Sequence, residues 1–112
     1  MKKPWAFICT ANNTSSATLR RYCRTVFQLG YEPVCPILNY GQFLVLDDPD
    51  ERSAYEEFVR DKILRSPMLV VCGRDIDAAA NAQIGLAQKH NRICTTLEGL
   101  TKAVQSGERF IS

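Results

Sequence analysis

The sequence has no long hydrophobic run, and its charge is nearly balanced. Its longest apolar stretches, residues 5–9 and 68–72, are far shorter than the roughly 20 apolar residues that a membrane helix needs. The formal net charge is +2, and no local cluster of lysine and arginine indicates nucleic-acid binding. Residues 1–3, Met-Lys-Lys, resemble the start of a signal peptide, but the apolar segment after them is too short for one. We therefore expect a cytoplasmic protein that binds neither membrane nor nucleic acid.

Several motifs of catalytic and metal-binding sites are also missing. The sequence contains no Walker motif, no G-x-G-x-x-G and no G-x-S-x-G. The single histidine, His90, falls at the expected C-terminus of a helix, where a protonated imidazole favours the helix dipole. Asp47, Asp48 and Asp50 resemble a metal cluster, but acidic residues at a helix start commonly cap it. We predict no cofactor and no metal ligand.

The five cysteines include no C-x-x-C pair. Cys9, Cys35, Cys72 and Cys94 lie in or next to expected strands, near the C-terminal ends, so they could form a row across the sheet. We interpret them as small hydrophobic core residues of a reducing compartment. A metal or redox site is the alternative, and it requires thiols that converge on one face of the sheet.

The chain of 112 residues, with 46% hydrophobic and 23% charged residues, predicts one globular domain over residues 1–112. Apolar and β-rich segments alternate with segments of helical character. We expect strands over residues 4–10, 32–38, 68–72 and 92–96. The first helix is expected to follow a cap at Ser15 or Ser16, and the second runs from Pro49 or Asp50 to Arg65. The third begins after Asp77 and ends near His90 and Asn91, and the last runs from Glu98 to Gln105.

This alternation predicts an α/β fold with right-handed crossovers. The expected architecture is a flavodoxin- or Rossmann-like three-layer sandwich with a four- to five-stranded, mainly parallel sheet in the order 2-1-3-4. Pro33 and Pro36 place the second strand at an edge. The predicted core contains Phe7, Ile8, Val34, Leu69, Val70, Val71 and Ile93, and the first helix contributes Leu19, Cys23, Val26 and Phe27.

The segment 68–87 combines a buried strand, a glycine turn at Gly73 and an alanine-rich helix. Asp77 is a good N-cap for that helix. At 100° per residue, one helix face carries an unusual polar group, Gln83. The residues on this face are Ile76, Ala80, Gln83, Ile84 and Ala87.

Ligands of open α/β sheets bind where the strand order reverses, which here lies between the first and third strands. Residues 10–14 and 73–77 would line that crevice. The neutral polar groups of the first loop suit a phosphate, a sugar or a base edge, and they suit an Asx-rich turn equally well. The candidate ligand-binding residues are Thr10, Asn12, Asn13, Thr14, Tyr40, Gly73, Asp75, Asp77 and Gln83.

Three motifs carry a resemblance to a known family: Phe-Ile-Cys-Thr at 7–10, Gly-Tyr-x-Pro-Val-x-Pro at 30–36 and Asp-Asp-Pro-Asp-Glu-Arg at 47–52. With the small-residue pattern at Ala80, Ile84 and Ala87, the chain resembles the nucleoside 2-deoxyribosyltransferase-like superfamily over roughly residues 5–95. The resemblance implies a flavodoxin-like sheet. In active members it implies attack on the anomeric carbon of a nucleoside or nucleotide by a glutamate of the third helix.

The sequence departs from this family's pattern within the implied site. The glutamate falls on Gln83, an amide without an anionic oxygen, so we predict that Gln83 faces the crevice and bonds Thr10, Asn12 or Asn13. The other departures are Asn12, Asn13 and Thr14 in place of a Tyr-Arg-Gly-like group, Asp77 and Ala79 in place of serine and glycine, and Pro67 in place of an aspartate.

We therefore expect a non-catalytic member that binds a nucleoside-like, nucleotide-like or other small polar ligand, or that acts in assembly. The alternative is an active N-glycosidase or deoxyribosyltransferase that uses a relocated carboxylate, Asp75 or Asp77. The apolar loop at 39–50 and the tail with Phe110 and Ile111 favour a homodimer or larger oligomer. This loop contains Tyr40, Phe43, Leu44, Val45 and Leu46.

Overall fold

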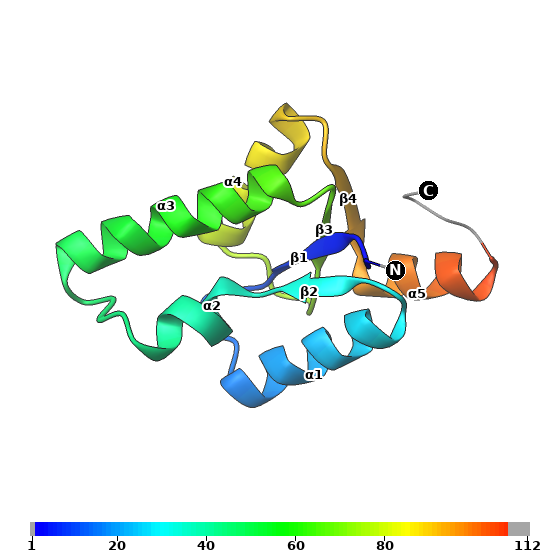
Figure 1. Ribbon diagram of the computed structural model, residues 1–112, viewed down its shortest axis with the longest axis horizontal. Helices are drawn as coiled ribbons and strands as arrows, with labels where there is room; N and C mark the ends of the chain where they lie inside the picture. Colours follow the sequence, from blue (N-terminus) through cyan, green and yellow to red (C-terminus); the bar gives the residue numbers. More distant parts are fainter. Residues whose placement is uncertain (1, 108–112) are drawn as a thin grey trace.

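A four-stranded, fully parallel sheet runs through the centre of the molecule, which we describe from a computed structural model over residues 2–107 (Figure 1). The order β2-β1-β3-β4 confirms the predicted α/β fold and strand order. Its register pairs Phe7 of β1 with Val34 on one side and with Leu69 on the other. The strands are β1 (Trp5–Cys9), β2 (Glu32–Val34), β3 (Met68–Val71) and β4 (Ile93–Thr96).

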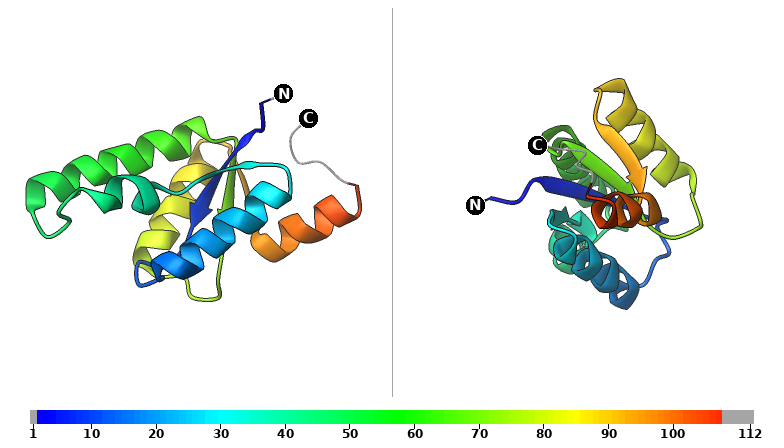
Figure 2. Two further views of the ribbon diagram at one scale, coloured as in Figure 1. Left: turned by 60° about the horizontal axis from the view of Figure 1, so that its bottom comes forward. Right: turned by 90° about the vertical axis from the view of Figure 1, so that its right-hand side faces the viewer.

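Helices cover both faces of this sheet (Figure 2). Helices α1 and α5 pack on one face, and α3 and α4 pack on the other. None of the helices in the described residues is long and apolar enough to cross a membrane. The helical elements are α1 (Ser16–Gln28), α2 (Pro36–Asn39), the 3-10 turn η1 (Tyr40–Gln42), α3 (Pro49–Arg65), α4 (Ala78–Lys89) and α5 (Leu97–Gln105).

Strand β1 is buried on both faces, as its continuous apolar run predicts. Ala6 and Ile8 pack towards α1 and α5, whereas Phe7 and Cys9 pack towards α3 and α4. Of the predicted core residues, Phe7, Ile8, Leu69 and Val70 are buried. Val34, Val71 and Ile93 are only half-buried, because they lie on edge strands or at the end of β3.

The helix ends follow local signals in the sequence. Ser15 caps α1 through a hydrogen bond from the Thr18 amide, and Asp48 and Asp77 cap α3 and α4. Asn91 adopts the left-handed conformation with φ of 60°, which confirms the predicted C-terminal cap of α4.

The segment 32–50 differs from the prediction. The second strand ends at Val34 because Pro36, which cannot continue the ladder, stands at the start of α2. The expected irregular loop contains the end of α2 and the η1 turn. There, the ring of Tyr40 packs at 4.5 Å from the ring of Phe58, so Phe58 turns towards this segment rather than into the core.

Two apolar side chains assigned to buried helix faces are exposed. Phe27 is 47% exposed and lies under the Lys3 ammonium, 5.1 Å from its ring centre. Ile76 is 49% exposed, because it precedes α4 and does not share its face. The predicted contact of Phe110 and Ile111 lies outside the described residues.

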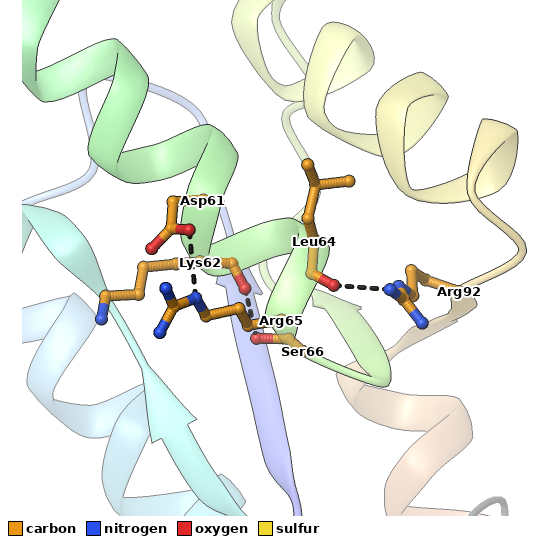
Figure 3. A network of polar contacts seen from close by, with 6 residues as sticks. All are labelled: Asp61, Lys62, Leu64, Arg65, Ser66 and Arg92. Carbon is orange, nitrogen blue, oxygen red and sulfur yellow. Dashed lines mark hydrogen bonds and ion pairs between the residues drawn. The ribbon is translucent and has the colours of Figure 1, made fainter.

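The C-terminal end of α3 is held by a group of polar contacts (Figure 3). Arg92 reaches from the start of β4 and donates from Nη2 to the Leu64 carbonyl at 2.6 Å. Ser66 donates to the Lys62 carbonyl at 2.7 Å. The Arg92 bond satisfies a carbonyl in the last turn of the helix, and the positive charge of Arg92 interacts favourably with the helix dipole. The Lys62 carbonyl also accepts a hydrogen bond from the Ser66 backbone amide at 3.0 Å.

Candidate functional site

The loops that follow β1 and β3 meet at the carboxyl edge of the sheet. The Cys72 amide donates to the Cys9 carbonyl at 2.9 Å, which keeps the two chain segments paired as they leave the sheet. Beyond this point, the backbone N–H of Asn12 donates to Asp77 Oδ2 at 2.7 Å. Asp77 Oδ1 accepts from the Ala80 amide at 2.8 Å. One carboxylate therefore joins the two loops and caps α4.

These contacts keep Asp77 ionised. Hydrogen bonds from the backbone amides of Asn12 and then Ala80 lower the pKa of the Asp77 carboxyl below its usual value. The N-terminus of a helix in this position commonly binds an anionic ligand. Here the side chain of Asp77 supplies the anion.

A cavity of about 650 Å³ lies beside this clamp, between α3, α4, α2 and the end of β1. Its volume falls within the range of small-molecule sites, roughly 300–1,000 Å³. Apolar side chains of β1 and α3, with neutral polar groups nearby, suit an organic ligand with polar substituents. Its lining includes Phe7, Ile8, Val59 and Ile63, the polar residues Thr10, Asn12, Thr14 and Gln83, and the charged residues Arg52, Glu56 and Arg60.

The structure divides the predicted ligand-binding residues into two sets. Thr10, Asn12, Thr14 and Gln83 line the cavity. The others lie outside its lining: Asn13 and Asp75 are exposed, Asp77 forms the clamp, Tyr40 packs on Phe58, and Gly73 turns with φ of 88° near the Tyr22 hydroxyl.

Gln83 is half-buried at the cavity, but its predicted hydrogen bonds to Thr10, Asn12 or Asn13 are not formed. Its amide bonds no residue in the part of the chain from 2 to 107. The backbone amide of Asn12 is committed to Asp77, and residues Asn12 and Asn13 are both exposed. The partly exposed Gln83 amide therefore remains available to water or to a ligand.

Arg52, Glu56 and Arg60 are site residues that the sequence did not reveal. They recur every four residues on α3, so they lie along one side of the helix. They border its apolar face, which contains Val59 and Ile63. The four-residue spacing was visible in the sequence, but charged residues at this spacing usually indicate a solvated face.

The cysteines separate onto opposite faces of the sheet, so the row across the sheet is not formed. Cys23, Cys35 and Cys72 pack on the α1 and α5 side, and Cys9 and Cys94 pack on the α3 and α4 side. All five are free. Within residues 2–107, no group of three or more histidine, cysteine or acidic residues is placed to hold a metal ion.

The model of a protein family described as "Domain of unknown function (DUF7768)" matches residues 6–96. The chain belongs to this family. The matched DUF7768 segment begins in β1 and ends at the last residue of β4, so it includes every residue that lines the cavity. Helix α5 lies outside it. No curated protein matches the sequence.

Proposed function

We propose that this protein binds a small ligand of the nucleoside or nucleotide class in the cavity between α3 and α4, without cleaving its glycosidic bond. One observation carries the proposal: Gln83 lines that cavity. At this position, the nucleoside 2-deoxyribosyltransferase-like proteins that the sequence resembles carry a nucleophilic glutamate.

The chemistry of the lining supports a ligand with an apolar ring and polar edges. Half-buried Ile37, Tyr55 and Leu86 in the lining offer apolar surface for a base. The amide of Gln83 has both donors and an acceptor, and the hydroxyl of Thr10 can donate or accept. Base edges and sugar hydroxyls need this mixture of partners.

The same lining argues against the glycosidic reaction of that superfamily. A neutral amide at Gln83 has no anionic oxygen to form a glycosyl ester. The clamp residue Asp77 has both carboxylate oxygens occupied by backbone amides, so it is a poor substitute. Asp75 lies exposed in the loop, outside the cavity lining.

Ligand screening with nucleosides and nucleoside monophosphates tests this function. Binding to the folded state raises the melting temperature, and Gln83→Ala should reduce the rise. Gln88→Ala is a matched control, because Gln88 is an exposed glutamine of the same helix. Chromatography of the incubated mixture should show no free base; steady release of base would overturn the non-catalytic proposal.

A second candidate function, N-glycosidic cleavage by a relocated carboxylate, is favoured by a single observation. Glu56 supplies a carboxylate to the cavity lining, which neither Asp75 nor Asp77 does. If the protein releases base, Glu56→Gln should abolish the release. Glu57→Gln, an exposed neighbour on the same helix, should leave it unchanged.

The apolar surface near η1 supports a homodimer, which is also part of the proposal. The N-terminal half of α3 and the segment around α2 extend beyond the sheet (Figure 1). Phe43 is 65% exposed and Val45 57% exposed there. Light scattering should give the mass of a dimer, and Phe43→Ser with Val45→Ser should shift it to that of a monomer. A wild-type monomer at micromolar concentration would contradict this assembly.

The cytoplasmic location stays a proposal that cell fractionation tests.

A further inference from the structure

We propose that the cavity takes a ligand with an anionic group, a nucleoside monophosphate, and that Arg52 and Arg60 of α3 bind its phosphate. This inference deepens the proposed function and rests on it. It places the anion away from the N-terminus of α4, where an open α/β sheet would ordinarily hold a phosphate.

The usual anion position is already filled. The two oxygens of Asp77 accept hydrogen bonds from the amides of Asn12 and Ala80. These backbone donors would otherwise be free to face a phosphate. A phosphate at this end of α4 would not receive hydrogen bonds from these amides, and the negative charge of Asp77 would repel it.

The opposite wall of the cavity carries the positive charge. Every charged residue in the described lining is on α3: Arg52, Glu56 and Arg60. Two positive groups and one negative group leave a net positive charge at the cavity. Neither arginine forms an ion pair within residues 2–107, where the two observed salt bridges join other residues. Their donors therefore remain available to a ligand.

The position of Arg52 is unfavourable for helix stability, which indicates another use for its charge. Helix α3 begins at Pro49 with Asp48 as its N-cap, so Arg52 lies at the end of the first turn. The helix dipole favours acidic residues there and disfavours a cation. Asp50 and Glu51 follow that rule, and Arg52 breaks it on the side that faces the cavity.

Arg52 and Arg60 flank Glu56 on the same side of the helix, and their two positive charges exceed its one negative charge. Eight residues separate Arg52 from Arg60, which is about 12 Å along the helix axis. Long arginine side chains can converge from both ends of this interval, and a guanidinium group binds phosphate oxygens through two parallel hydrogen bonds. The neutral groups of Thr10, Asn12 and Gln83 then remain for the sugar and base.

Calorimetric titration of one nucleoside and its 5′-monophosphate tests the inference. We expect the monophosphate to bind at least about tenfold more tightly at low salt, with a smaller ratio at high salt, because salt screens exposed charges. Arg52→Ala with Arg60→Ala should bring the ratio of monophosphate to nucleoside affinity close to one, mainly by weakening monophosphate binding. Nucleoside affinity should change less than about twofold. Arg21→Ala with Arg24→Ala removes the same charge from the exposed side of α1 and should keep the ratio.

The outcomes that overturn the inference are separable. If the nucleoside binds and the monophosphate binds no better, the anion site is wrong and the proposed function stands. If the preference persists in the Arg52 and Arg60 double variant but increases in Asp77→Asn, the phosphate binds at α4. If neither compound binds, the proposed function fails, and this inference fails with it.

Discussion

The carboxylate of Asp77 accepts a 2.7 Å hydrogen bond from the backbone N–H of Asn12, 65 residues earlier in the chain. This bond joins the loop after β1 to the residue that caps α4. The two segments are the sides of the crevice where the strand order reverses. A position that would serve a ligand in many α/β proteins is thus used here to hold the two loops together.

The clamp predicts an acid-dependent loss of stability. Because hydrogen bonds from Asn12 and Ala80 lower the pKa of Asp77, its ionised form stabilises the fold above its ordinary value of 3.8. That contribution is lost as the pH falls through the lowered pKa. Asp77→Ala should therefore lower the melting temperature at pH 7, and the difference from wild type should shrink in strong acid.

Circular dichroism melts at pH 7 and in strong acid measure this effect, since the pKa of Asp77 is lowered from its ordinary value. Asp75→Ala is the control, because Asp75 is exposed and accepts no hydrogen bond from residues 2–107. An equal loss in both variants at pH 7 would contradict the clamp.

We expect Arg92 to stabilise the C-terminal end of α3 more than the exposed Arg65 does. Replacing Arg92 with methionine removes the bond to the Leu64 carbonyl and leaves that acceptor without its partner, which costs on the order of 1–3 kcal/mol. Urea denaturation measures the loss. Arg65→Met is the matched control, because the Arg65 side chain is 65% exposed and its ion pair in the described residues is with exposed Asp61. Exposed pairs contribute about 0–1 kcal/mol, so a larger loss in Arg65→Met would contradict this ranking.

The part of the fold that depends on local chemistry could be predicted from the sequence. The caps at Ser15 and Asp77 and the buried strand β1 follow from neighbouring residues and from a continuous apolar run. The segment after Val34 could not, because Pro36 is compatible with an edge strand or with the first turn of a helix.

The candidate site was less predictable for a physical reason. Thr10 and Gln83 were identified because they follow a strand end and interrupt an apolar helix face. Arg52 and Arg60 were missed, since their role depends on where α3 lies relative to α4. That arrangement depends on the packing of Val59 and Ile63 of α3 with Ala80 of α4 in one core cluster. The periodicity of each helix shows which face is apolar, but not which other helix that face contacts.

The cysteines should differ in reactivity. The neighbouring Cys35 thiol lowers the pKa of Cys23, whereas burial raises the pKa of Cys9 and of Cys72 to about 12. Because the thiolate reacts, iodoacetamide at pH 8 should modify Cys23 first and leave Cys9 and Cys72 unmodified until the protein unfolds. Peptide mass spectrometry measures the order.

A variant at the neighbouring thiol tests the cause of this order. Cys35→Ala removes this neighbouring thiol and should move the pH midpoint of Cys23 alkylation upward. Rapid labelling of Cys72 in the folded protein would show that burial does not control reactivity. An unchanged pH midpoint in Cys35→Ala would show that the Cys35 thiol does not lower the pKa of Cys23.

The last prediction concerns Gln83→Glu. Adding the carboxylate alone should not create robust release of base from a deoxynucleoside, because Asn12 is held by Asp77 and no described residue bonds Gln83 to orient it. Positioning of reacting groups can supply about 7–11 kcal/mol of a barrier, so a nucleophile without it is a weak catalyst. The new carboxylate should also repel a phosphate and compete with it for Arg52 and Arg60, so it should weaken monophosphate binding more than nucleoside binding.

Chromatography of base release and calorimetric titration of the same variant check both parts. Gln83→Ala is the companion variant: it should weaken the two ligands equally, since it removes an amide and no charge. Base release by the natural protein that disappears in Gln83→Ala would make Gln83 part of a catalytic site. Release that survives in Gln83→Ala and disappears in Glu56→Gln would assign the reaction to the carboxylate of α3, because Glu56 is the acidic group that lines the cavity within residues 2–107.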